Sequence, residues 1–192
     1  MLILRFRFTL VFLLVMLIAN LLAAGLGEDL PDTMLRAWGV GHDSLRTGEA
    51  FRLLTGTFLS HDAGMLMRQL IFAAVVIGYT EWVRGTIQTV VLFFGLDIVG
   101  TLLLLACVGM AQGIGIIDIA ALNDVGMSIG GFGLIGLALT TWQRTWLLLA
   151  LILVAITLKL AIAPHLLADG GHVLALLLGV ALGQVLPLFK PR

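Results

Sequence analysis

Residues 126–136 read GMSIGGFGLIG, an apolar segment that holds five glycines and a single hydroxyl group, that of Ser128. A polar side chain at membrane depth is costly, so Ser128 needs a partner or a function. Glycines let a neighbouring helix approach closely enough to supply that partner. The best candidate is His172, which opens a second glycine-rich apolar segment, residues 171–183. The pattern therefore predicts a serine and an imidazole that face each other across two closely packed helices.

The composition indicates a membrane protein. Of the 192 residues, 60% are hydrophobic and 11% are charged, and the mean hydropathy is +1.13. Soluble domains usually carry about 25% charged residues, so we predict a polytopic membrane protein with a single domain, residues 1–192. The formal net charge is zero and the basic residues are scattered, which excludes nucleic acid as a partner. The single cysteine, Cys107, allows no intrachain disulfide.

Six apolar segments have about the length that crosses a bilayer core. We predict spans at residues 8–26, 65–83, 86–109, 124 or 125–141, 146–162 and 171–188. The predicted fold class is therefore an all-α membrane protein, a bundle of six transmembrane helices. Residues 27–64 combine many charges with a tryptophan and several leucines, and we expect them to form a structured interfacial loop. A cleaved signal peptide is the competing interpretation of the first segment.

The basic residues predict the orientation of the chain in the membrane. Six spans place both termini on one side, together with the two short turns near residues 82–86 and 142–145. That side collects Arg5, Arg7, Arg84, Arg144, Lys190 and Arg192. By the positive-inside rule both termini are cytoplasmic. Ser128 and His172 then lie near the outer ends of their helices, at similar depth. Import into organelles usually needs an Arg-rich and Ser-rich leader, and none is seen. We therefore expect the protein to lie in a bacterial plasma membrane.

Ser128 and His172 also form a chemically useful pair. A serine hydroxyl attacks a carbonyl carbon when a base takes its proton, and a neutral imidazole is the usual base. Ser128 shares a helix face with Gly131 and Ile135, and His172 shares one with Gly179. The structural alternatives are a serine that bonds back to its own helix and a histidine that anchors a helix at the interface. Asn123 and Asp124 precede the fourth span, where we expect them to cap its helix.

Four stretches resemble the rhomboid family of intramembrane serine proteases. Residues 126–136 resemble the fourth-helix motif, GxSG followed by phenylalanine, glycine and leucine. Gly171-His172, followed by Ala175 and Gly179, resembles the sixth-helix motif that carries the catalytic histidine. Residues 48–55, GEAFRLLT, resemble the Trp-Arg motif of the first loop, and residues 78–85, GYTEWVRG, match the end of the second helix. The resemblance covers about residues 47–185.

The resemblance implies a function and a set of site residues. It implies that Ser128 is the nucleophile and His172 the general base, and that an acyl-enzyme forms with a transmembrane protein substrate near the outer face. No cofactor and no metal ion is required. The expected partners are transmembrane proteins and the lipid bilayer.

The chain departs from the family pattern next to these residues. Ile129 follows the serine, where the family has glycine. Met65 and Gln69 stand where the family carries a histidine and an asparagine that help to hold the oxyanion, and only Gln69 retains a donor amide. His61 lies one residue out of register with another family histidine. These departures leave an alternative open, an inactive rhomboid-like pseudoprotease that binds or guides membrane helices.

A third interpretation rests on two charged residues inside predicted spans. Asp97 lies in the third span and Lys159 in the fifth. Intramembrane charges often belong to proton or ion relays, so a small transporter or channel is the remaining alternative. The structural interpretation of the same residues is a buried ion pair, or a lysine that extends to the interface.

Overall fold

A computed structural model describes residues 5–25, 27–113, 123–163 and 165–185. The described residues form helices and no β-strand, apart from one isolated antiparallel bridge between Val40 and Asp124. The helices are α1 (Arg7–Ala23), α2 (Asp32–Trp38), α3 (His42–Arg46), α4 (Arg52–Thr55), the 3₁₀ helix η2 (Gly56–Phe58), α5 (Ala63–Arg84), α6 (Thr86–Gly113), α7 (Ser128–Leu139), α8 (Thr145–Ile162) and α9 (Leu166–Val185). The expected all-helical fold class is confirmed.

Four of the helices are long and apolar enough to cross a membrane, namely α5, α6, α8 and α9. Two further apolar helices are shorter, α1 with 17 residues and α7 with 12. The prediction of a multi-pass helical membrane protein is therefore supported, whereas only four of the six predicted spans meet the length of a span. The helix α7 is short because it begins at Ser128, three or four residues after the predicted start.

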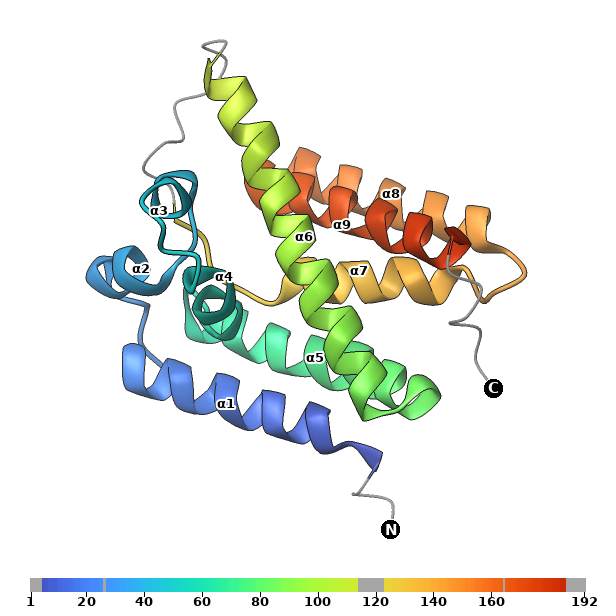
Figure 1. Ribbon diagram of the computed structural model, residues 1–192, viewed down its shortest axis with the longest axis horizontal. Helices are drawn as coiled ribbons and strands as arrows, with labels where there is room; N and C mark the ends of the chain where they lie inside the picture. The colour runs from blue at the N-terminus through green and yellow to red at the C-terminus, as the bar shows by residue number, and fades with distance from the viewer. Residues whose placement is uncertain (1–4, 26, 114–122, 164, 186–192) are drawn as a thin grey trace.

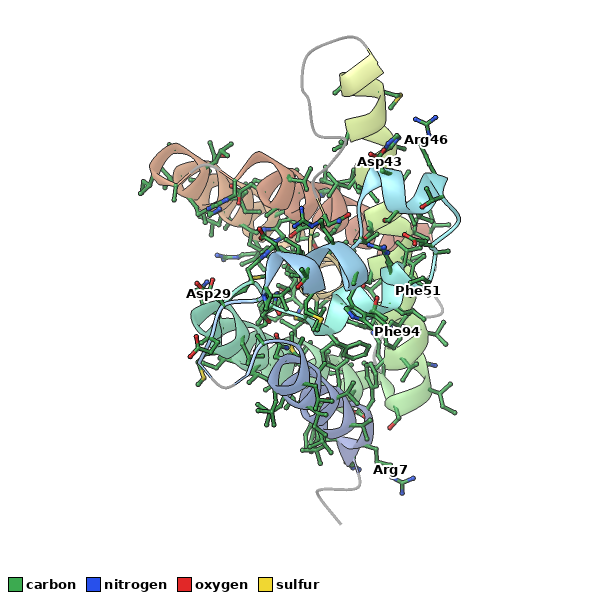
Figure 2. All side chains as sticks on the ribbon, turned by 90° about the vertical axis from the view of Figure 1, so that its left-hand side faces the viewer. Arg7, Asp29, Asp43, Arg46, Phe51 and Phe94 are labelled. Atoms are coloured by element: carbon green, nitrogen blue, oxygen red, sulfur yellow. The ribbon has the colours of Figure 1, made fainter. Side chains whose placement is uncertain are left out.

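The long helices run roughly side by side, and α6 crosses them (Figure 1). The start of α1, the end of α9 and the α5–α6 and α7–α8 turns lie together, at what we call the turn end. The short helices α2, α3 and α4 lie at the other end, the loop end. Figure 2, viewed from the loop end, shows Asp43 and Arg46 of α3 in the upper part of the molecule and Arg7 of α1 at its lower edge. Successive long helices therefore run in opposite directions between the two ends.

The helix α7 packs against α5, α6 and α9, and its glycines make the close approaches. A Cβ atom built on Gly131 would lie 2.3 Å from the ring of Phe72 in α5. One built on Gly136 would lie 2.1 Å from the carbonyl oxygen of Leu176 in α9, and one on Gly179 of α9 would lie 2.0 Å from that of Gly133. The two helices therefore touch backbone to backbone, as the glycine pattern predicts, although Gly131 faces α5 and not α9.

Glu81, near the C-terminus of α5, binds α1 to the rest of the helices. Its buried carboxylate accepts hydrogen bonds from the backbone N–H groups of Phe8 and Thr9, both at 2.9 Å. The hydroxyl groups of Thr9 and Thr86 donate to it as well, both at 2.7 Å. A carboxylate at the first turn of α1 satisfies N–H groups that have no partner within the helix, and it complements the helix dipole.

Residues 27–64 are a folded part of the molecule, as predicted. Arg52 of α4 donates to the carbonyl oxygens of Arg36 and Gly39 and pairs with Glu49, with 2.7 Å between Nη2 and Oε2. Trp38 and Phe51 meet edge to face at the surface, with 6.2 Å between their ring centroids. Arg52 thus holds α2 and α4 together at the loop end.

Candidate functional site

Ser128 is the first residue of α7, and the preceding loop fixes its position. Val40 and Asp124 exchange both backbone hydrogen bonds, at 2.9 and 2.8 Å. Gly126 donates its N–H to the carbonyl oxygen of Gly56 at 2.8 Å, and its φ of 126° is a conformation that favours glycine. Residues 124–126 are therefore extended and bound to the loop end. Asp124 does not cap α7 as predicted, since its side chain accepts from Val125 N and His61 instead.

His172 lies in the second turn of α9, not at the start of the helix as predicted. The helix begins earlier, at Leu166, because Asp169 in the first turn accepts a hydrogen bond from the backbone N–H of His165 at 3.2 Å. The carboxylate of Asp169 also binds Lys159 of α8 at 2.8 Å. The predicted loop of residues 165–170 is therefore mostly helix.

The imidazole of His172 lies against α7, next to the turn that carries Ser128. Its ring stacks on Phe132, with 4.3 Å between the centroids and 17° between the planes. Phe132 follows Ser128 by four residues and so lies one helical turn further on the same face. Within the described part of the chain, no hydrogen bond joins Ser128 to His172. The structure brings the two predicted residues onto facing helices and leaves the proton-transfer contact unmade.

Ile129, the residue that follows the serine, is accommodated by glycines of two other helices. A Cβ built on Gly100 of α6 would lie 2.6 Å from Cγ2 of Ile129, and one built on Gly171 of α9 would lie 3.4 Å from its Cδ1. The branched side chain therefore fills the space between α6 and α9. The same contact places Gly171 and the neighbouring His172 beside the first turn of α7.

Gln69 is buried next to the loop that leads to Ser128. Its side chain is 6% exposed, and its Oε1 accepts a hydrogen bond from Ser60 Oγ at 2.9 Å. This bond turns the amide so that Nε2 faces Gly126, where a Cβ would lie only 2.4 Å away. The predicted oxyanion donor, Gln69 Nε2, therefore lies beside Gly126, which precedes Ser128 by two residues. The partner that orients it, Ser60, was missed by sequence reasoning because it carries no pattern of its own.

Met65 and His61 do not add a second donor at this place. The Met65 methyl group would lie 3.0 Å from a Cβ on Gly126, and its sulfur accepts a weak hydrogen bond from His61 N at 3.4 Å. The ring of His61 turns to Asp124 instead, with 3.1 Å between Nε2 and Oδ1. The hydrogen bond to this carboxylate raises the pKa of His61 above its ordinary value, although partial burial opposes the shift.

The His61–Asp124 pair predicts a pH-dependent contribution to stability. A histidine whose pKa is raised in the folded state stabilises that state. This stabilisation is fully present below the unfolded pKa of about 6.5, and it is lost as the pH rises through the raised pKa of the folded state. Both side chains are more than a third exposed, so we expect only about 0.2–1 kcal/mol. The melting temperature of the wild type should exceed that of Asp124→Asn by more at pH 5.5 than at pH 9. A difference that is constant with pH would contradict this assignment.

A small cavity of about 30 Å³ borders Ser128 on the side of α6. The polar side chains on its lining belong to Thr57, Asp97, Thr101, Asp124 and Ser128. This volume holds about two water molecules. His172 does not line the cavity. The cavity therefore offers water a polar place beside Ser128.

Asp97 and Lys159 bind different groups and are not partners of each other. Asp97 in α6 is 3% exposed, with Oδ1 2.8 Å from the backbone N of Gly130 and Oδ2 2.7 Å from Oγ1 of Thr57. Lys159 of α8 binds Asp169, as described above. The buried ion pair between Asp97 and Lys159 that the sequence allowed is therefore not formed. The bond from Asp97 to the first turn of α7 could not be foreseen from spacing.

Comparison of the chain with protein-family models and with curated proteins finds no match to either.

Proposed function

We propose that this chain is an intramembrane serine endopeptidase of the rhomboid type, which cleaves transmembrane proteins near the outer membrane face. The observation that supports it best is the packing of α7 on α9, which sets His172 over the turn that follows Ser128. Gln69 supplies an amide donor beside Gly126, two residues before the same serine. A nucleophile, a base and an oxyanion donor are the minimum set for acyl transfer.

The reaction requires a nitrogen of the His172 imidazole to come within hydrogen-bond reach of Ser128 Oγ. A nitrogen of His172 takes the proton of Ser128 Oγ as the oxygen attacks the scissile carbonyl carbon. The positive end of α7 and the Nε2 of Gln69 stabilise the oxyanion. The C–N bond breaks, the amine leaves with the proton from His172, and an ester remains on Ser128. A water activated by His172 then hydrolyses the ester, and no cofactor takes part.

The proposed setting follows from the same assignment. Both termini lie in the cytoplasm of a bacterial cell, and the loop end faces outward from the plasma membrane. The basic residues at the turn end support this orientation.

A second candidate function is that of a rhomboid-like pseudoprotease that binds or guides membrane helices. The stacked ring of His172 and the absence of a donor on Met65 favour it. Loss of one oxyanion donor costs about 3–4 kcal/mol in other serine enzymes. Such a loss slows turnover without removing the chemistry, so a slow protease and an inactive pseudoprotease differ in whether Ser128 reacts at all.

Labelling with a fluorophosphonate probe distinguishes the two functions. We expect the purified protein in detergent to label, and Ser128→Ala to lose the label completely. Ser44→Ala, which removes a buried serine of α3, is the matched control and should label like wild type. Cleavage of a reporter protein with one membrane helix should follow the same pattern. A folded wild type that never labels would overturn the protease and favour the pseudoprotease.

A further inference from the structure

Asp97 connects three parts of the molecule from a buried position in α6. It belongs to α6, its Oδ1 contacts the backbone N of Gly130 in the first turn of α7, and its Oδ2 contacts the hydroxyl group of Thr57 in η2. Thr57 directly follows Gly56, which binds the loop before Ser128. The carboxyl group of Asp97 thus joins the loop end and α6 to the helix that begins with Ser128.

The contacts of the Thr57 hydroxyl favour a protonated Asp97 side chain. Thr57 Oγ1 lies 2.7 Å from Asp97 Oδ2 and 2.9 Å from the carbonyl oxygen of Leu53. A threonine hydroxyl carries one proton, and an ionised carboxylate carries none, so together they could make only one of the two bonds. If Asp97 is protonated, its Oδ2–H donates to Thr57 and the Thr57 hydroxyl donates to Leu53. Every contact is then a hydrogen bond, including the one from Gly130 N to Oδ1.

The surroundings of Asp97 also favour the neutral acid. The described residues that line its cavity include a second carboxylic acid, Asp124, and no basic side chain. Lys159 of α8 is bound to Asp169, and Arg52 of α4 is bound to Glu49. Among the described residues, no basic side chain therefore contacts Asp97. An uncompensated buried charge is far more costly than a hydrogen-bonded neutral group.

We propose that Asp97 is a positioning residue that holds the first turn of α7, and with it Ser128, as a neutral carboxylic acid. A carboxylate at this place would set a negative charge against the positive end of α7, where the oxyanion forms. The neutral acid keeps the hydrogen bond to Gly130 without that charge. The effect on Ser128 rests on the proposed function, whereas the protonation state and the link between the helices do not.

Infrared spectroscopy tests the protonation state directly. Asp97→Asn has the shape of the neutral acid, because its Oδ1 can accept from Gly130 and its Nδ2 can donate to Thr57. The difference spectrum of wild type minus Asp97→Asn in detergent at neutral pH should show the C=O stretch of a protonated carboxylic acid, shifted in deuterated water. Loss of a carboxylate band in its place would overturn the proposal.

Stability and labelling test the positioning role. Asp97→Asn should melt close to wild type, whereas Asp97→Ala should melt roughly 4–8 °C lower because Gly130 and Thr57 lose their partner. The rate of fluorophosphonate labelling should be about the same in Asp97→Asn and fall about tenfold or more in Asp97→Ala, since a shifted nucleophile loses its attack geometry. An asparagine variant as impaired as the alanine variant would overturn the proposal. If wild type never labels, the proposed function fails, and the infrared and melting results still decide the state of Asp97.

Discussion

Replacement of His172 by alanine is expected to slow the labelling of Ser128 by about 10²–10⁴-fold, the contribution of a general base. The ring of His172 is the imidazole that the packing of α9 holds against α7, through Phe132. His61 does not replace it as a base, because its ring is bound to Asp124, four residues before Ser128. The measurement is the rate of fluorophosphonate labelling of purified protein in detergent, with a melting curve for each variant to show that it is folded.

His165→Ala is the matched control for this experiment. His165 immediately precedes α9 and its side chain is exposed, while its backbone N–H, which binds Asp169, survives the substitution. The control should label at the rate of the wild type. If His172→Ala labels as fast as His165→Ala, then His172 is not the base, and Ser128 is activated in another way or not at all.

Replacement of Gly179 by alanine is expected to destabilise the protein by about 3 kcal/mol or more, the upper range for overpacking. The added Cβ would lie 2.0 Å from the carbonyl oxygen of Gly133 and 2.8 Å from the backbone N of Leu137. Backbone atoms of a helix cannot turn aside as a side chain does, so α7 and α9 must separate. For a protein of this size we expect a melting temperature that is lower by about 6–12 °C.

Gly95→Ala provides the matched control in another membrane helix. No atom lies within 4 Å of a Cβ built on Gly95 in α6, so the substitution adds no clash. Alanine is the better helix former by about 0.5–1 kcal/mol, and Gly95→Ala should melt at or slightly above the wild-type temperature. Equal melting temperatures of the two variants would show that α7 and α9 do not touch at Gly179. The labelling rate of any folded Gly179→Ala protein should fall as well, because His172 moves with α9.

Much of the architecture could be predicted from local patterns in the chain. Apolar segments of sufficient length gave the long helices, since backbone polar groups in a membrane must bond within their own segment. The glycines of residues 126–136 and 171–183 gave the close contact between α7 and α9, because only a residue without a Cβ permits backbone contact there. The pairing of Ser128 with His172 on facing helices followed from the same two segments, whereas the expectation that Gln69 lies near the serine came from the resemblance to the rhomboid family.

Contacts between residues distant in the chain decided the rest. The bridge from Val40 to Asp124 keeps the residues before Ser128 extended, so α7 begins at the serine and not at Asp124. Ile129 is accommodated because Gly100 and Gly171 leave room for it, and neither position is a neighbour in sequence.

The sequence by itself determined which segments are helices and which two helices touch, because these properties depend on hydrophobicity and glycine spacing within a segment. Only the tertiary structure decided where α7 and α9 begin and which groups Asp97 and His61 bind. Helix ends and buried polar groups are satisfied by partners that folding brings from elsewhere in the chain, and no local pattern specifies those partners.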